Sequence, residues 1–233
     1  QALEPYLEGL QLHWREAPAQ SKDETVVRGV AAPFDREGGL RRLQGNLGRA
    51  VVKISAVAPE FRRIEAPARI FESQDALLDA FKGDALIGDF VAVVRGQGPR
   101  ANGMPELHKL TPTLAALQDR GQRVALLTDG RMSGASGKVL AAIHVTPESS
   151  VAGPLAKLRE GDLVRIDAEA GTMEALVEAG EWDGRAFSKP ELAANRVGHG
   201  RELFAPMRRQ VGPAEQGACS LFLDEDSADE DAP

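Results

Sequence analysis

Residues 89–96 read DFVAVVRG and residues 124–129 read VALLTD, and these two apolar runs decide the fold. Each run is short and nearly continuous in apolar residues, and each is followed by a loop that is rich in glycine. Strands that are buried on both faces have this pattern, because neither face leaves room for a polar side chain. Each run therefore predicts a strand inside a covered sheet.

Strand and helix patterns surround these two runs. Residues 74–83 (QDALLDAFKG) and 110–121 (LTPTLAALQDRG) space their apolar residues as helices do, and both end in glycine. Residues 161–177 alternate apolar and polar residues around a turn, which is typical of a β-hairpin. Further short strands are predicted in 43–57, 64–73 and 139–145. Helix is predicted in 188–209, interrupted by VGHG at 197–200. Strands outnumber the crossover helices, so we predict a mixed α/β domain that is more barrel-like than doubly wound.

The negative charge of the chain is concentrated at its end. The chain has 233 residues and a formal net charge of −7, and its last ten residues contain six acids and no Lys or Arg. The nearly neutral body lacks the basic field that nucleic-acid binding requires. No apolar stretch approaches the ~18 residues of a membrane helix. We therefore expect a soluble cytoplasmic protein that binds neither nucleic acid nor membranes.

The sequence predicts three parts. Residues 1–42 mix aromatic residues with proline and charge and are predicted to be a connector that packs on a missing N-terminal domain. Residues 43–223 form the α/β domain, and residues 224–233 form an acidic tail that we expect to be disordered, because it has no apolar anchors. Gln1 in place of an initial methionine predicts a piece of a longer protein. Cys219 is the only cysteine, so it cannot form an internal disulfide or hold a metal cluster by itself.

Two glycine-rich loops follow the buried strands and carry the polar residues best suited to chemistry. The first loop, residues 96–108, contains Glu106 and His108. The polar residues of the second loop are Asp129, Arg131, Ser133, Ser136 and Lys138. Ligands collect at the carboxyl ends of strands in open α/β sheets, and glycines let backbone N–H groups converge on an anion. Either loop alone is typical of an ordinary surface turn. Two glycine-rich loops at adjacent strand ends, however, predict a ligand site.

Common catalytic motifs fail on their spacing. Residues 130–138 (GRMSGASGK) resemble a phosphate-binding loop, but no Ser or Thr follows Lys138. Ser133 is flanked by Arg131 and Ala135 where a nucleophile elbow requires glycines, which disfavours a serine hydrolase. The four histidines show no metal-binding spacing and are interpreted as structural.

Several longer segments carry a resemblance to a known family. These segments are GNLGRAVVKISAV, EAPARIFES, GPRANGMPELHKLTP, LLTDGRMSGASGK, AAIHVTPE, LREGDLVRID and NRVGHGRELF. In this order they resemble the C-terminal domain of the dihydroxy-acid dehydratase and 6-phosphogluconate dehydratase family. GMPE at 103–106 and TDGRMSG at 128–134 are the most specific of these segments. The residues around them favour the phosphogluconate branch of the family. The similarity runs from about Tyr6 to Phe222.

The resemblance implies a fold, a reaction and partners. The implied fold is a swivelling-type β/β/α barrel with many short strands and a few helices. The implied reaction removes water from 6-phospho-D-gluconate and gives 2-dehydro-3-deoxy-6-phosphogluconate, as in the Entner–Doudoroff pathway. It implies an iron–sulfur cluster that binds the leaving hydroxyl and a magnesium ion that holds the substrate. The implied partners are the protein's own N-terminal domain, a phosphorylated sugar acid and a second copy in a homodimer.

The resemblance also implies roles for single residues. Ser133, in GRMSG, matches the serine that takes the C2 proton as an alkoxide, a role that requires nearby cations and N–H donors to lower its pKa. Glu106, in GMPE, matches a magnesium ligand, since Mg²⁺ prefers carboxylate oxygens. The cluster ligands are expected in the N-terminal domain, and this chain alone is expected to be inactive. The predicted substrate-binding residues are Asp129, Arg131, Lys138, Arg196 and Arg201.

Other functions stay open at this point. The chain could belong to a dehydratase that acts on another sugar acid or dihydroxy acid. It could also be a binding module for a sugar acid or a phosphate that uses the same two loops without chemistry. A serine hydrolase would need a histidine brought close to Ser133 by the fold. The cations Lys138, Arg196 and Arg201 could equally be surface charges paired with acids.

Overall fold

The computed structural model describes residues 5–8, 11–14, 16, 18, 20–36, 38–132 and 137–221. The chain divides into two compact units, Gln1–Gly39 and Leu40–Pro233. In the first unit, strands β1 (Pro5–Glu8) and β2 (Gln11–Trp14) form an antiparallel hairpin, where the sequence predicted only irregular structure. The acidic tail, residues 224–233, lies outside the described residues.

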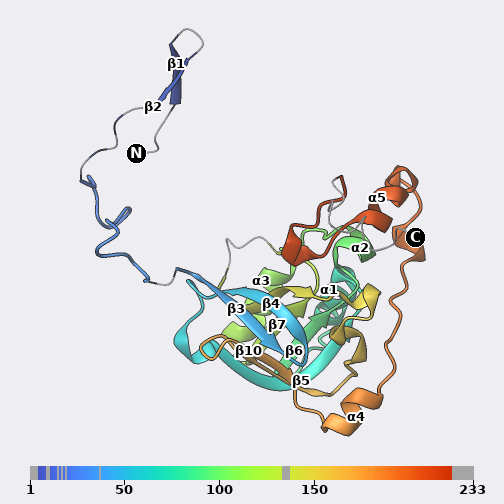
Figure 1. The fold of residues 1–233 in the computed structure, drawn as a ribbon. Helices are drawn as coiled ribbons and strands as arrows, with labels where there is room; N and C mark the ends of the chain where they lie inside the picture. Colours follow the sequence, from blue (N-terminus) through green and yellow to red (C-terminus); the bar gives the residue numbers. More distant parts are fainter. Residues whose placement is uncertain are drawn as a thin grey trace. The chain divides into compact units, whose positions relative to one another are not determined.

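The second unit is built on a closed barrel of eight strands (Figure 1). Around the barrel, the strands follow the order β10-β3-β4-β8-β7-β6-β5-β9, with β5 to β8 as a run of parallel neighbours. This arrangement confirms the predicted barrel-like α/β fold. The strands are β3 (Leu40–Gly45), β4 (Gly48–Lys53), β5 (Arg63–Phe71), β6 (Phe90–Val94), β7 (Val124–Thr128), β8 (Leu140–Thr146), β9 (Leu163–Asp167) and β10 (Thr172–Ala175).

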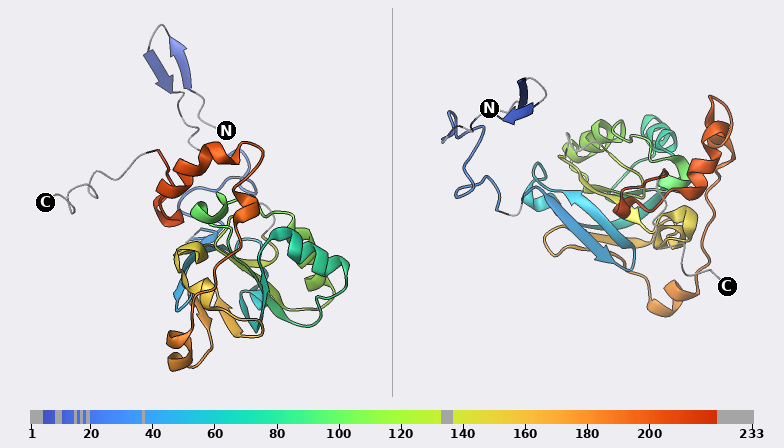
Figure 2. Two further views of the ribbon diagram at one scale, coloured as in Figure 1. Left: turned by 90° about the vertical axis from the view of Figure 1, so that its right-hand side faces the viewer. Right: turned by 45° about the horizontal axis from the view of Figure 1, so that its top comes forward.

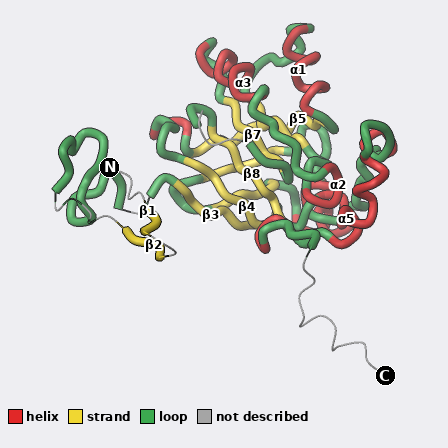
Figure 3. The backbone as a smooth tube through the Cα atoms, turned by 90° about the horizontal axis from the view of Figure 1, so that it is seen from above, coloured by secondary structure: helices red, strands yellow, loops and turns green. Residues whose placement is uncertain are grey.

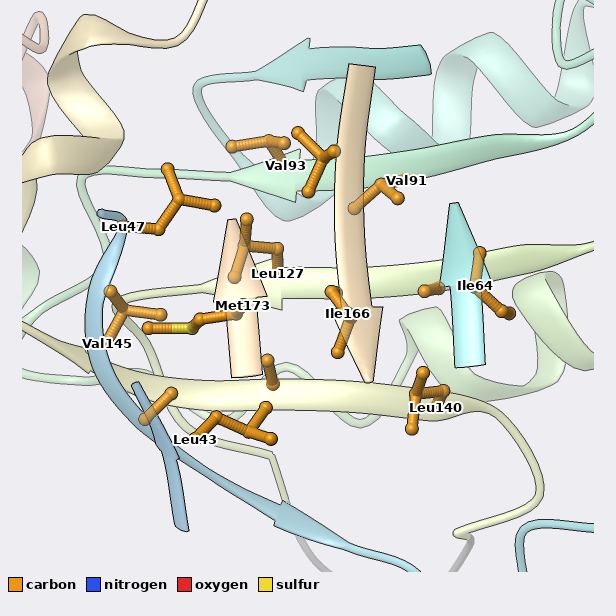
Figure 4. Close-up of a cluster of buried hydrophobic side chains, with 14 of the residues drawn as sticks. Leu43, Leu47, Ile64, Val91, Val93, Leu127, Leu140, Val145, Ile166 and Met173 are labelled. Atoms are coloured by element: carbon orange, nitrogen blue, oxygen red, sulfur yellow. The ribbon is translucent and has the colours of Figure 1, made fainter. Parts of the chain in front are cut away.

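Every residue of β6 and β7 is buried, as the two apolar runs predicted. Side chains alternate between the two faces of a strand. Val91, Val93 and Leu127 therefore point into the barrel, where they share a cluster with Ile166 and Met173 (Figure 4). The alternate residues of β6 and β7 belong to a second cluster that includes helix residues. Two cores thus cover the two faces of these strands.

Helices α1 (Gln74–Lys82) and α3 (Leu110–Asp119) confirm the two predicted helices and pack outside the barrel (Figure 3). The Ser73 hydroxyl caps α1 by accepting a hydrogen bond from the backbone N–H of Ala76. Strands β9 and β10 pair antiparallel with Ile166 opposite Met173, which confirms the predicted hairpin. Among the described residues, no helix is long and apolar enough to cross a membrane.

The prediction of helix over residues 188–209 is wrong for most of that range. Besides short 3-10 turns, the segment contains only α5 (Ala205–Gln210). Gly198 and Gly200 adopt φ of 85° and 77°, which lie in the left-handed region, so they end any helix that would run through them. The chain instead folds as a connected series of turns.

This C-terminal segment lies over the edge of the barrel where β6, β7 and β8 end. Pro190 packs against Gly96, and the Arg49 guanidinium forms an ion pair with Glu215 at 2.5 Å. Helix α5 lies beside the short helix α2 (Pro99–Asn102), as both views of Figure 2 show. The remaining short helix, α4 (Ala179–Gly184), lies at another part of the barrel. The carboxyl ends of three parallel strands therefore have a cover made of residues far along the chain.

Candidate functional site

The two glycine-rich loops lie side by side, as their positions after β6 and β7 predicted. Glu106 and Arg131 form a parallel β-bridge, and the backbone N–H of Leu107 donates to the carbonyl oxygen of Arg131 at 3.1 Å. Because β6 and β7 are parallel neighbours, their carboxyl ends meet at one edge of the barrel. GMPE and residues 128–132 of the second loop thus lie on one surface.

The side chains of Glu106 and Arg131 form an ion pair on this surface. Nη1 of Arg131 lies 3.2 Å from Oε2 of Glu106, and Nε of Arg131 donates to the carbonyl oxygen of Met104 at 2.8 Å. Gly103 and Met104 both have positive φ, which turns the chain sharply just before Glu106. The ion pair is partly exposed, so it contributes only about 0–1 kcal/mol to stability. Either partner can therefore exchange the other for a ligand at small cost.

Ser133 lies outside the described residues, as do its neighbours to residue 136. The chain before this stretch is anchored, because Thr111 Oγ1 donates a hydrogen bond to the sulfur of Met132 at 3.0 Å. The predicted role of Ser133 stays a prediction.

Asp129 is fully buried, in contrast to the predicted contact with substrate. Its carboxylate accepts hydrogen bonds from the backbone N–H groups of Gly96, Gln97 and Ser149 at 2.9–3.2 Å, and from the Ser149 hydroxyl at 2.6 Å. Burial raises the pKa of Asp129, and these hydrogen bonds offset part of that shift. Asp129 therefore ties together the loops that follow β6, β7 and β8.

Lys138, predicted to bind substrate, is placed away from Glu106. Its ammonium group pairs with Asp119, the last residue of α3, whereas Glu106 precedes the first turn of that helix. A helix rises 1.5 Å per residue, so the ten residues of α3 separate the two by about 15 Å. The polypeptide after β7 has crossed to the opposite end of the barrel by the time it reaches Lys138, because β8 starts there.

Arg201 lies near the first loop, whereas Arg196 is an exposed residue that ends a short turn. Nη1 of Arg201 donates to the carbonyl oxygen of Asn195 at 2.9 Å and to Oδ1 of Asn102 at 3.4 Å. Asn102 closes α2, just before the GMPE turn. The structure therefore brings Arg201, but not Lys138, to the edge that carries Glu106 and Arg131.

His144, for which the sequence predicts a structural role, lies beside the second loop. Its backbone N–H donates to the carbonyl oxygen of Gly130 at 2.9 Å, and its φ of 57° is left-handed. Partial burial lowers the pKa of His144, and the positive charge of Arg131 lowers it further. His144 therefore lies within electrostatic range of Arg131. The histidine has no sequence signal beyond its position near the end of a strand.

The described residues fit only part of a metal centre. They contain no group of three or more His, Cys, Asp or Glu side chains placed to hold a metal ion. Glu106 offers one carboxylate at a partly exposed edge, which suits a single oxygen ligand of a hard cation. Cys219 is exposed on the C-terminal segment.

Comparison with known proteins identifies the family of this chain. Residues 25–218 match the model of the dihydroxy-acid/6-phosphogluconate dehydratase C-terminal family, and the chain belongs to that family. It is similar to the phosphogluconate dehydratase of Pseudomonas aeruginosa, with 59% identity over 94% of this chain and 36% of that protein. The phosphogluconate dehydratase of Escherichia coli K12 is 52% identical over 94% of this chain and 37% of that protein.

A more distant relative carries another name. The dihydroxy-acid dehydratase of Nitratidesulfovibrio vulgaris is 43% identical over 83% of this chain and 32% of that protein. The chain thus spans about a third of the length of the curated relatives that it matches.

Proposed function

We propose that this chain is the C-terminal part of a hydro-lyase that removes water from 6-phosphogluconate and gives 2-dehydro-3-deoxy-6-phosphogluconate. The observation that carries the proposal is the bridge between Glu106 and Arg131, which brings GMPE and residues 128–132 together. The identity of 59% to a protein named phosphogluconate dehydratase supports this substrate over a branched-chain dihydroxy acid.

In this proposal, Glu106 donates one oxygen to a magnesium ion whose other ligands come from the rest of the enzyme. Such an ion and an iron–sulfur cluster, when bound, supply positive charge to the substrate carboxylate and to the departing hydroxyl. Once Glu106 turns to the metal, the guanidinium of Arg131 becomes available to a substrate oxyanion. Its planar N–H groups match a carboxylate in two parallel hydrogen bonds.

Ser133 is proposed to accept the proton from C2 as an alkoxide. The hydroxyl at C3 leaves with its bonding electrons, and the resulting enol takes up a proton at C3 to become the 2-keto product. The positive charge of Arg131, two residues away in sequence, favours the anionic form of a nearby hydroxyl. The predicted N-terminal domain, the homodimer and the cytoplasmic location stay predictions.

The base assignment is tested by Ser133→Ala in the full-length enzyme. General-base catalysis typically contributes 10²–10⁴-fold, so kcat should fall by at least about 100-fold while substrate still binds. The measurement is the formation of 2-keto product from 6-phosphogluconate. Ser55→Ala is the matched control, because Ser55 is exposed in the turn after β4. Nearly normal turnover by Ser133→Ala would exclude the role, and turnover of a branched-chain dihydroxy acid alone would exclude the substrate.

A further inference from the structure

A cavity of about 380 Å³ lies between α2 with its following turn and the C-terminal segment. Its walls include the apolar side chains of Met104, Phe204, Met207 and Val211. Its polar lining residues are Asn102, Asn195, Arg201, Arg208 and Ser220. Arg201 is exposed and Arg208 is partly buried, so both guanidinium groups are accessible to an anion in the cavity.

The segment that forms one side of this cavity has an excess of positive charge. Residues 193–221 contain four arginines and two glutamates. One of the acids, Glu215, is paired with Arg49. The other, Glu202, accepts a hydrogen bond from the backbone N–H of Gly198, and its carboxylate interacts with the charge of Arg208. Among the ion pairs of the described residues, none joins an acid to Arg201, so the charge of Arg201 can act on a ligand in the cavity.

Arg201 is also held in place. Its Nη1 group binds Asn195 and Asn102, and its Nε and Nη2 groups can still donate to a ligand. An arginine that is already oriented loses less conformational entropy when it binds an oxyanion. Phosphate oxygens match its remaining N–H groups well.

The cavity adjoins the candidate site through a single turn. Met104 lines the cavity, and its carbonyl oxygen accepts the hydrogen bond from Nε of Arg131. Glu106 follows two residues later and pairs with the same arginine. One ligand molecule can therefore contact both the Glu106–Arg131 surface and the cavity.

We infer that this cavity binds the phosphate group of a phosphorylated sugar acid, with Arg201 as the main ligand and Arg208 as the second cation. The inference rests on the proposed function, and it names the part of the chain that selects phosphorylated substrates. Arg196, which the sequence suggested for the same role, is not among the lining residues.

The test uses Arg201→Gln, Arg208→Gln and the matched control Arg209→Gln in the full-length enzyme. Arg209 is an exposed residue of α5 and is not among the lining residues. Loss of charge-assisted hydrogen bonds to the phosphate should raise KM for 6-phosphogluconate at least about tenfold in Arg201→Gln. The kcat should change less than the KM does, Arg201→Lys should be intermediate, and the control should match the wild type.

Calorimetric titration separates this inference from the proposed function. Arg201→Gln should weaken the binding of 6-phosphogluconate about tenfold and leave the binding of unphosphorylated gluconate unchanged. Inorganic phosphate should compete with 6-phosphogluconate in the wild type and not in Arg201→Gln. An active enzyme whose KM and affinity are unaffected by Arg201→Gln and Arg208→Gln would overturn the inference alone. A protein that binds 6-phosphogluconate through Arg201 without turning it over would contradict only the proposed function.

Discussion

At the scale of single residues, Asp129 shows that a polar side chain in a loop motif can serve the fold. In the sequence, Asp129 lies close to Arg131 and Ser133, for which chemical roles are predicted. The structure surrounds its carboxylate with donors from Gly96, Gln97 and Ser149. A buried carboxylate of this kind fixes the relative positions of three loops, because it accepts hydrogen bonds from all of them and buried donors need acceptors.

Asp129→Asn should destabilise the protein by about 2 kcal/mol or more, since the new amide N–H₂ group would face N–H donors. The folded protein raises the pKa of Asp129 above its usual 3.8, so its protonated form is favoured by folding. This contribution is complete below that value and is lost as pH rises through the raised pKa. The deficit of Asp129→Asn should therefore shrink as pH rises. Urea unfolding at several pH values measures the stability deficit of Asp129→Asn, and Asp183→Asn, at an exposed position, is the control. A deficit that grows with pH would contradict the prediction.

At the scale of elements, β6 and β7 lie between two hydrophobic cores and contribute side chains to both. Their alternate side chains belong to the barrel interior and to the cluster that includes α1 and α3. A strand buried on both faces is nearly continuous in apolar residues, which is why its sequence pattern was clear. The loops that follow β6 and β7 are held in position by these buried strands.

Leu127→Ala should lower the free energy of unfolding by about 2–5 kcal/mol, because Leu127 is fully buried in the barrel and its loss leaves a cavity. Leu163→Ala is the control, since Leu163 is 39% exposed and should cost no more than about 1 kcal/mol. Urea unfolding followed by circular dichroism gives both values. Equal losses in the two variants would show that Leu127 does not pack as described.

At the scale of the whole molecule, the chain folds around its own core but presents an incomplete set of catalytic groups. Its described residues supply one candidate metal ligand, Glu106, and the chain spans about a third of its relatives. The edge that carries Glu106 and Arg131 is covered by the segment from Ser188 to Leu221, which follows every strand of the barrel. Residues 188–221 and the carboxyl ends of β6, β7 and β8 are therefore far apart in sequence and adjacent in space.

The chain alone should give no measurable dehydration of 6-phosphogluconate. Mixing it with a separately produced polypeptide for the rest of the enzyme should restore activity that depends on magnesium and on the cluster. The same mixture made with Ser133→Ala should stay inactive, which shows that the chemistry uses this chain. Turnover by the isolated chain would contradict the view that its site is incomplete.

The sequence by itself determined the buried strands, helices α1 and α3, the hairpin of β9 and β10, and the pairing of the two loops, because these features depend on local periodicity and on parallel neighbours. Only the tertiary structure decided that Asp129 is buried, that Lys138 lies at the opposite end of the barrel, and that Arg201 borders a cavity beside the first loop. These placements depend on contacts between residues far apart in the chain. Local sequence patterns do not encode such contacts, because burial and charge pairing arise only when the barrel closes and the C-terminal segment packs across its edge.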